Sequence, residues 1–275
     1  MIKNKKYYTI AGWLAALYFI LLFLVPLLRM FTLSFFSEGK ISFEYYTTIF
    51  TSPVYLRVLY RTLYVSFLVT GIGLVIGYAI SYFISQKSEK QQKKWLILVL
   101  SPMFMSLTIR LFGWMMLLGQ EGLINRVFSW LSPGKDGIPL LFSYTAVAIG
   151  IVHYCLPFII LNIYASLKRV DNALIEASLM LGESKVKTFW KVIFPLSLPG
   201  IFAAASISFA LSASTFLVPL MLGGPNNLFV SNLAYNAIVN MGDYPQGAAL
   251  SIVLLFIVVI VLSIISFFER RSRIA

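Results

Sequence analysis

One short segment of this chain combines a carboxylate, small side chains, a glycine and a proline at spacings that suit protein docking. Glu176 is followed directly by Ala177 and Ser178, Gly182 comes four residues later, and Pro195 closes the segment. Small side chains let the backbone of another protein approach closely, and a neighbouring carboxylate can pair with a basic residue on that protein. The segment therefore predicts a docking surface, although an amphipathic helix lying on a membrane surface has the same composition.

The segment also carries the signals of two short helices joined by a turn. Asp171 can cap a first helix with its interior at 173–181, and Gly182 follows where a left-handed residue ends a helix most easily. Ser184 can cap a second helix, which Pro195 is expected to end. The first helix is expected to present a narrow face of small and apolar side chains, formed by Leu174, Ala177, Ser178 and Leu181.

The rest of the chain must hold this segment in a membrane. Of the 275 residues, 59% are hydrophobic and only 12% are charged, whereas soluble domains carry roughly 25% charged residues. Six apolar stretches are long enough to cross a bilayer as helices. We therefore predict a single all-α integral membrane domain over residues 1–275, with spans at about 9–36, 62–85, 95–119, 140–167, 200–222 and 248–268.

The basic residues predict how these spans are oriented. With the N-terminus inside, fifteen Lys and Arg residues fall in the inner segments, five fall in the outer segments, and two, Arg29 and Arg110, lie within spans. Cytoplasmic segments of membrane proteins are enriched in Lys and Arg. Both termini are therefore expected in the cytoplasm, together with the segment 168–199 between the fourth and fifth spans.

Residues suited to catalysis or to metal binding are scarce. His153 and Cys155 lie on the same predicted span, where they are expected to be packed residues rather than ligands. The chain has no glycine-rich phosphate-binding motif, and its net charge of +12 is explained by membrane orientation rather than by nucleic acid. We expect no enzyme, no metal site and no cofactor bound by this chain.

Polar groups inside the spans are the remaining candidates for a solute path. No Asp or Glu lies in any predicted span, so Arg110 is expected to have a structural role, paired with a neighbour or with backbone carbonyls. Pro102, Pro157 and Pro219 are expected to break the third, fourth and fifth spans. Possible path residues are Ser212, Ser214, Thr215, Tyr235 and Asp243.

The order of residues in the docking segment resembles the EAA loop of ABC-importer permeases. That family pattern is Glu-Ala-Ala, three residues, Gly, nine residues, then Ile, one residue and Leu-Pro. Glu176, Ala177, Gly182 and Pro195 match the pattern, while Ser178, Val192 and Phe194 replace its second Ala, its Ile and its Leu. The segment also lies between the two spans where this family has it, so the resemblance favours docking over a surface helix.

The resemblance implies a permease of the bacterial inner membrane with several partners. In this family the loop is a coupling helix that docks on a cytoplasmic ATPase dimer, which uses ATP with magnesium. Glu176 would anchor the dock, Ala177 and Ser178 would permit close approach, and Gly182 would set the elbow. A second permease, expected to be a different chain, and an extracytoplasmic binding protein complete such importers.

A narrower resemblance concerns the transported solute. Segments 52–63, 77–83, 106–114, 122–125 and 222–226 are similar to spermidine/putrescine permeases of the first-permease type. This resemblance implies a polyamine solute, with another amine, an amino acid derivative or an anion as the alternative. An ion-coupled secondary transporter is disfavoured because neither intramembrane acids nor inverted repeats are present.

Overall fold

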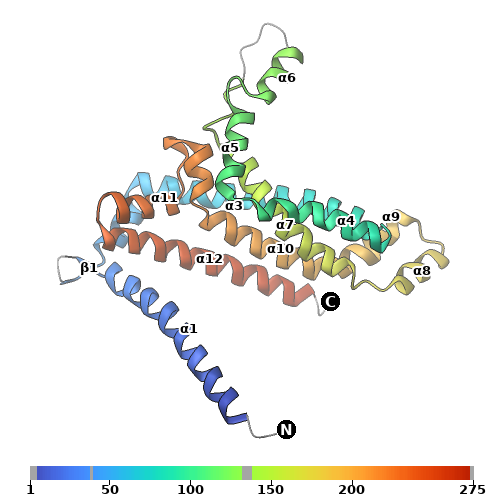
Figure 1. Cartoon of the computed structure of the whole chain (residues 1–275), viewed down its shortest axis with the longest axis horizontal. Coiled ribbons are helices and arrows are strands. Elements are labelled where there is room, and N and C mark those ends of the chain that lie inside the picture. Colours follow the sequence, from blue (N-terminus) through green and yellow to red (C-terminus); the bar gives the residue numbers. More distant parts are fainter. Residues whose placement is uncertain (1–4, 38–39, 132–137, 273–275) are drawn as a thin grey trace. The chain divides into compact units, whose positions relative to one another are not determined.

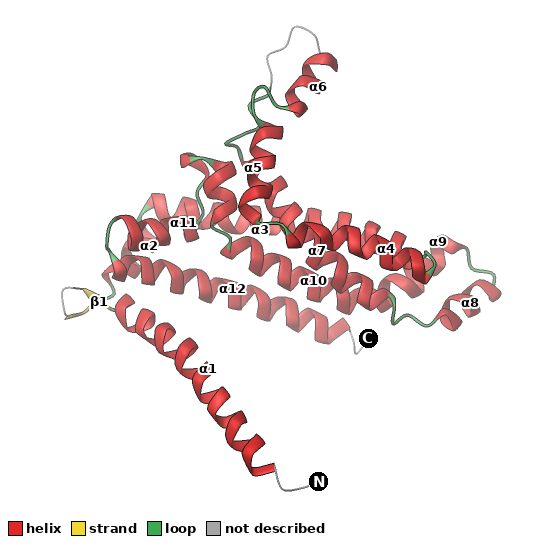
Figure 2. Ribbon diagram, viewed as in Figure 1, coloured by secondary structure: helices red, strands yellow, loops and turns green. Residues whose placement is uncertain are grey.

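The computed structural model describes residues 5–37, 40–131 and 138–272, and their regular secondary structure is helical apart from one small hairpin (Figures 1 and 2). The hairpin pairs β1 (Phe36–Ser37) with β2 (Lys40–Ile41) in antiparallel register. Contacts between Cα atoms divide the chain into two compact units. Unit 1 comprises Met1–Leu56 and Leu233–Val253, and unit 2 comprises Arg57–Asn232 and Leu254–Ala275.

Unit 1 contains the first helix of the chain and the short helix that follows it. In α1 (Lys5–Ser34), the stretch Gly12–Ser34 is long and apolar enough to span a membrane, and none of it is buried. The hydroxyl groups of Ser34 and Tyr46 lie 2.7 Å apart and tie the end of α1 to α2 (Glu44–Thr51). The ring of Phe35 packs 5.1 Å from that of Tyr46 at the same junction. Unit 1 also holds η5 (Asn236–Asn240).

Unit 2 is built around three long helices, α3 (Pro53–Ser85), α7 (Tyr144–Leu167) and α10 (Phe194–Ser214), which Figure 1 shows running alongside one another. Small residues let α3 and α7 approach closely. A Cβ atom added at Gly73 or at Gly77 would lie 2.6 Å or 2.5 Å from the side chain of Ile159. Close backbone approach at small residues is the usual basis of helix packing in membranes, where lipid removes the hydrophobic driving force.

The crossing of α7 and α10 follows the same principle. Gly200 of α10 lies against Ser166 and against the carbonyl oxygen of Asn162, so that any side chain at this position would collide with α7. Across the α3–α7 crossing, the Ser81 hydroxyl donates to the carbonyl of Ile160 at 3.1 Å. These contacts surround a fully buried apolar core that includes Leu111, Ile159, Ile163, Phe209 and Leu222.

The predicted third span is two helices rather than one. It consists of α4 (Glu89–Leu100), the 3₁₀ turn η1 (Ser101–Phe104) and α5 (Leu107–Leu118), and the direction changes by 94° at this break. Pro102 lies in the 3₁₀ turn, as expected, and Met105 and Ser106 are extended. Beyond α5, α6 (Leu123–Leu131) occupies the predicted amphipathic stretch. The predicted Pro133–Gly134 turn lies outside the described residues.

Three predicted helix breaks were wrong. α7 continues through Pro157. Pro195 does not end the second short helix, because α9 (Lys185–Thr188), the π-helical turn η2 (Phe189–Ile193) and α10 form one continuous helix. A π-helical turn lets the neighbouring backbone groups form other hydrogen bonds where proline has no N–H to donate. The predicted fifth span breaks at the extended Thr215 instead of at Pro219, which begins the π-helical turn η3 (Pro219–Gly223).

The segments after this break lead to the last span. The 3₁₀ turn η4 (Pro225–Asn227) and α11 (Val230–Tyr235) precede η5, and α12 (Tyr244–Ser272) ends the described chain. Within the described residues, five helices are long and apolar enough to cross a membrane, and the bent α4–α5 pair makes six if it is one span. The predicted number of about six spans agrees with this range of five to six.

Candidate functional site

The segment 168–199 folds locally as its sequence predicts up to Ser184. In α8 (Asn172–Met180), the Asp171 carboxylate caps the first turn by accepting a hydrogen bond from the Ala173 amide at 2.9 Å. Gly182 has φ of +83°, the left-handed conformation expected of a residue that ends a helix. The Ser184 hydroxyl accepts a hydrogen bond from the Lys187 amide at 3.3 Å and caps α9. The start of each helix and the turn between them are therefore fixed by interactions between residues close together in the sequence.

The two faces of α8 differ in what they contact. Leu174 is 49% exposed and Leu181 is 85% exposed, and Ala177 and Glu176 are exposed with them. Ser178, predicted to share this face, instead turns toward α9, and its hydroxyl oxygen lies 2.9 Å from that of Thr188. The outward face of α8 is thus apolar and small, with the Glu176 carboxylate beside it.

Two lysines hold the turn between α8 and α9. The Glu183 carboxylate accepts a hydrogen bond from Lys191 Nζ at 2.6 Å, and Lys187 Nζ lies 3.5 Å from its other oxygen. The hydrogen bond from Lys191, together with the charges of both lysines, holds the pKa of the Glu183 carboxyl below its usual value. This ion pair joins the residue after the elbow to η2.

A cluster of aromatic rings, which the sequence analysis did not single out, joins this segment to α3. Phe189 packs edge-on against Tyr82 and Tyr78, with centroid distances of 5.1 Å and 5.8 Å. The Tyr78 hydroxyl also lies 3.0 Å from the Ser197 hydroxyl of α10. Tyr78 and Tyr82 are four residues apart and share one helix face, a spacing that was available in the sequence.

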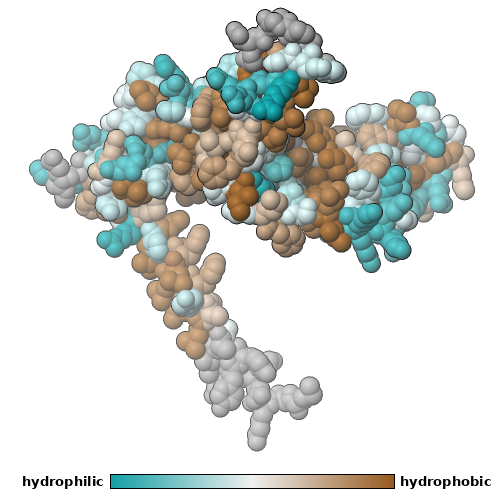
Figure 3. Space-filling model, turned by 45° about the horizontal axis from the view of Figure 1, so that its top comes forward, coloured by the Kyte–Doolittle hydropathy of each residue, from teal (hydrophilic) through white to brown (hydrophobic). Residues whose placement is uncertain are grey.

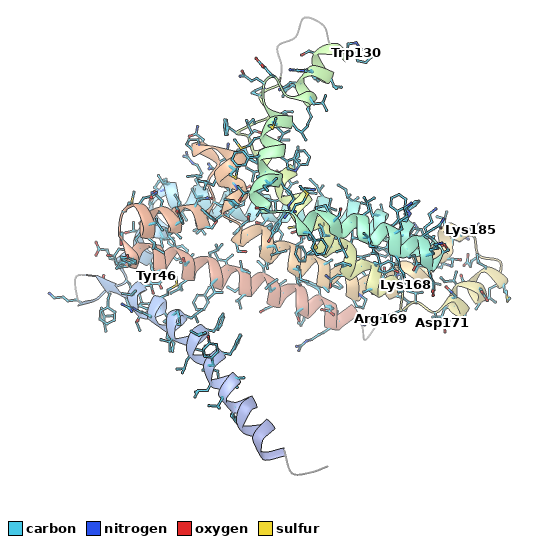
Figure 4. The ribbon with its side chains drawn as sticks, viewed as in Figure 1. Tyr46, Trp130, Lys168, Arg169, Asp171 and Lys185 are labelled. Carbon is cyan, nitrogen blue, oxygen red and sulfur yellow. The ribbon has the colours of Figure 1, made fainter. Side chains whose placement is uncertain are left out.

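A cavity of about 200 Å³ lies between the aromatic end of α3 and the inward face of α8, with Tyr82, Ile175, Leu179, Thr188 and Ile193 in its wall. Figure 4 shows Lys168, Arg169, Asp171 and Lys185 around α8 at this end of unit 2, away from Trp130 of α6. In Figure 3, hydrophilic side chains mark the same end next to a band of apolar surface. The part of the segment 168–199 around α8 is therefore exposed at the end of the helix bundle, while the part from α9 onward leads into the bundle.

The predicted path residues of unit 2 lie at the end of α10. Ser212 is fully buried and donates its hydroxyl hydrogen to the Phe209 carbonyl at 3.0 Å. Ser214 is exposed and donates to the Ala210 carbonyl at 2.7 Å. Thr215 is buried, and its carbonyl accepts a hydrogen bond from the Ser231 hydroxyl at 2.7 Å. These hydroxyls surround the break between α10 and η3.

The two predicted path residues of unit 1 are Tyr235, before Gly242 in the chain, and Asp243, directly after it. Tyr235, at the end of α11, is 44% exposed. The Asp243 carboxylate accepts a hydrogen bond from the Gln246 amide at 3.0 Å and caps the first turn of α12. Asp243 is therefore the cap at the start of α12.

The charged and titratable residues within the bundle lie near one another in unit 2. Trp114 Nε1 donates to His153 Nδ1 at 3.3 Å, so the half-buried His153 has a hydrogen-bond partner. Arg110 Nε is buried and has no hydrogen-bond partner among the described residues. In the same part of the chain, no group of three or more His, Cys, Asp or Glu side chains is placed to hold a metal ion.

The fold and the attached loop define a class of membrane protein. The profile of the family described as "Binding-protein-dependent transport system inner membrane component" matches residues 12–274. The chain belongs to this family, and it is an inner-membrane permease subunit of an ABC importer rather than an enzyme.

Individual relatives are similar to this chain in sequence over nearly its whole length. The spermidine/putrescine transport system permease protein PotB of Escherichia coli K12 is 32% identical over 272 residues, covering 96% of each chain. PotB of Salmonella typhimurium SL1344 is 32% identical over 279 residues, covering 98% of this chain and 94% of that protein. A bacterial ABC transporter that imports the acidic polysaccharide alginate has the same fold, with a TM-score of 0.83 at 20% identity over 98% of this chain and 96% of that one.

Proposed function

We propose that the segment 168–199 is the coupling loop of this permease and that the outward face of α8 docks on a cytoplasmic ATPase. The observation that carries this proposal is the exposure of apolar side chains on a polar loop. Met180 and Leu181 are each 85% exposed and Leu174 is 49% exposed. Exposed apolar groups that lie together favour burial by a partner.

Each residue of the loop has a separate part in this proposal. Glu176 pairs with a basic residue of the ATPase, and Ala177 leaves room for the partner's backbone to approach. Gly182 sets the elbow through its left-handed backbone. Ser178 acts inside the loop through Thr188, and Pro195 lies in the continuous helix that leads from the loop into the membrane.

The proposed orientation places both termini and the coupling loop in the cytoplasm. The excess of Lys and Arg in the segments that this orientation puts inside supports it. We propose that residues 1–275 act as one permease domain, since the family profile matches residues 12–274.

The proposed assembly requires several other chains. This chain binds no cofactor, and an ATPase dimer supplies the motor by hydrolysing ATP with magnesium. A second permease of different sequence forms the path with this one, and an extracytoplasmic binding protein delivers the solute. The family description, which names dependence on a binding protein, supports the last of these partners. Proposed path residues are Ser212, Ser214, Thr215, Tyr235 and Asp243.

We propose a polyamine as the transported solute. Relatives named for spermidine and putrescine transport, 32% identical over nearly the full chain, support this choice. The Arg110 guanidinium would repel a polycation if it faced the path, so a structural place for Arg110 within the bundle is part of the proposal. An anionic solute is the alternative that Arg110 would favour.

The docking proposal is tested by placing a charge on the exposed face of α8. Leu181→Asp is expected to abolish both co-purification of the ATPase and ATP-driven uptake. Docking would bury the new carboxylate and remove its water, which costs free energy. Ile41→Asp, in the β2 hairpin strand, is the matched control because Ile41 is also apolar and 73% exposed. Normal ATPase association of Leu181→Asp would refute the docking surface.

The solute is tested in proteoliposomes that contain this permease and its co-expressed partners. Uptake of radiolabelled spermidine and putrescine is compared with that of amino acids and organic anions, with and without the ATPase subunit. We expect uptake of the two amines only, and only with ATP and the ATPase. Uptake of anions alone would overturn the polyamine assignment and leave the permease class intact.

A further inference from the structure

A long groove between α3 and α7 is not accounted for by the coupling loop or by the proposed path. It has a volume of about 850 Å³, and Trp114 of α5 also lines it. Its walls are one face of α3, from Arg57 to Ile76, and one face of α7, from Tyr144 to Leu156. All of these residues belong to unit 2.

The groove is polar at one end and mostly apolar along the rest of its length, where His153 is a polar exception. The polar end carries Arg57, Arg61 and Tyr144, which lie near the first residues of α3 and α7. The remaining wall is mostly aliphatic, with residues such as Leu68, Ile72, Ile76, Ile149 and Leu156. This end of the bundle is opposite the end from which the segment 168–199 emerges, since that segment follows the last residue of α7.

The polar end is positively charged. Arg57 is exposed, and no acidic residue is among those that line the groove. Arg61 is held in place by its own contacts: its guanidinium donates to the carbonyls of Asn226 and Leu228 and lies 5.2 Å from the centroid of the Tyr144 ring. Carbonyl oxygens and an aromatic face orient this guanidinium without cancelling its charge. A cationic solute would be repelled here, whereas an anionic group would be attracted.

The groove is long enough to hold a lipid of one leaflet. The lining residues of α7 cover thirteen positions, about 18 Å from first to last, and those of α3 cover twenty positions, about 28 Å. Half of the hydrocarbon core is about 15 Å thick, and a headgroup layer lies beyond it. A ligand with its anionic group at Arg57 and its apolar part along α3 and α7 would therefore lie parallel to the lipids of that leaflet.

Charge at the polar end distinguishes a lipid from a helix of another protein. An apolar membrane helix brings no anion to Arg57, whereas an anionic lipid headgroup does. We propose that this groove binds an anionic glycerophospholipid, with its phosphate at Arg57 and Arg61 and its acyl chains between α3 and α7.

The test uses the assembled importer in nanodiscs of phosphatidylcholine, with a trace of phosphatidylglycerol that carries a photoreactive diazirine in its acyl chain. The same diazirine on phosphatidylcholine is the neutral comparison. After irradiation, labelled residues are mapped by mass spectrometry. We expect labels to concentrate on the groove faces of α3 and α7, and phosphatidylglycerol to label them more than phosphatidylcholine does.

Two variants separate the headgroup site from the acyl site. Arg57→Gln is expected to reduce groove labelling by phosphatidylglycerol about fivefold, the effect of one basic residue on binding of an anionic lipid. Arg126→Gln, on α6 outside the groove, is the matched control and should leave labelling unchanged. Ala148→Trp, which fills the half-buried wall of the groove, is expected to reduce labelling by both lipids.

Several outcomes would overturn the proposal. Equal labelling by the two lipids would show that the arginines do not select an anion. Labels spread evenly over the outer surface of the bundle would show that the groove holds no particular lipid. Absence of groove labels in the assembled importer would assign the groove to a protein segment. None of these readouts requires ATP or solute, so each is independent of the proposed transport function.

Discussion

The hydroxyl oxygens of Ser178 and Thr188 lie 2.9 Å apart and join α8 to the helix that continues through η2 into α10. Thr188 is 2% exposed, so this hydrogen bond is shielded from water. The aromatic contacts of Phe189 with Tyr78 and Tyr82 begin at the next residue. A displacement of α8 by the proposed ATPase partner would therefore reach both α10 and α3 through residues next to this bond.

Thr188→Val is predicted to loosen α8 without unfolding the bundle. Valine keeps the shape of threonine and removes the hydroxyl, and a typical hydrogen bond contributes about 1 kcal/mol. We expect amide exchange in 172–180 to accelerate about fivefold and ATP hydrolysis per transported solute to rise. Thr188→Ser keeps the hydroxyl and is the control. Unchanged exchange in Thr188→Val would mean that the bond does not hold α8.

Gly182→Leu is predicted to weaken coupling through backbone strain. The φ of Gly182 is +83° and a Cβ there would meet no atom within 4 Å, so a substitution costs conformational energy but makes no clash. A left-handed residue other than glycine costs about 1–2 kcal/mol. ATPase association and uptake should both fall in Gly182→Leu, and less in Gly182→Asn, because asparagine tolerates this conformation. Equal losses in the two variants would argue against strain as the cause.

Gly77→Ala is predicted to destabilise the α3–α7 crossing. The added methyl group would lie 2.5 Å from Ile159 Cγ2, and overpacking of this kind costs about 1–3 kcal/mol. Gly71→Ala, on the same helix, is the matched control because a Cβ there meets nothing within 4 Å. Thermal unfolding in detergent compares the stability of both variants with that of the natural chain.

Ile159→Ala provides a second check on the same crossing. It removes Cγ2, so Gly77→Ala is expected to cost less in the Ile159→Ala background than in the natural chain. If the cost of Gly77→Ala is the same in both backgrounds, the two residues do not contact each other.

Acidification is predicted to loosen the turn between α8 and α9. The pKa of the Glu183 carboxyl is lowered in the folded protein, chiefly by the hydrogen bond from Lys191. Its stabilising contribution is therefore fully present above the unfolded value, near 4.5, and is lost as the pH falls through the lower folded pKa.

Amide exchange of residues 182–191, measured from pH 6 to pH 3, tests the effect of acid. Protection is expected to fall below about pH 4.5 in the natural chain and to show a smaller transition in Lys191→Met, where only Lys187 still pairs with Glu183. Lys185→Met, which removes a lysine that forms no ion pair among the described residues, should keep the natural profile. A transition of the same size in Lys191→Met would exclude the Glu183–Lys191 pair as its origin.

The sequence by itself determined the class of the protein, the range of five to six spans and the local structure of the loop up to Ser184. The length of an apolar stretch decides whether it can cross a bilayer. Such a stretch forms a helix because its backbone must satisfy its own hydrogen bonds in lipid. The caps at Asp171 and Ser184 and the left-handed Gly182 were predictable because each depends on atoms only a few residues away. The resemblance to ABC-importer permeases was confirmed over 12–274.

Only the tertiary structure decided where helices break and which side chains meet. Pro157 and Pro195 lie in helices that continue, because neighbouring helices and wider turns compensate for the missing hydrogen bond, while the chain bends by 94° near Pro102. Ser178 turns toward Thr188 because α9 folds back beside α8, a contact that helical spacing within α8 does not reveal. The groove beside Arg57 likewise exists only because α3 and α7, far apart in the sequence, lie side by side in the same unit.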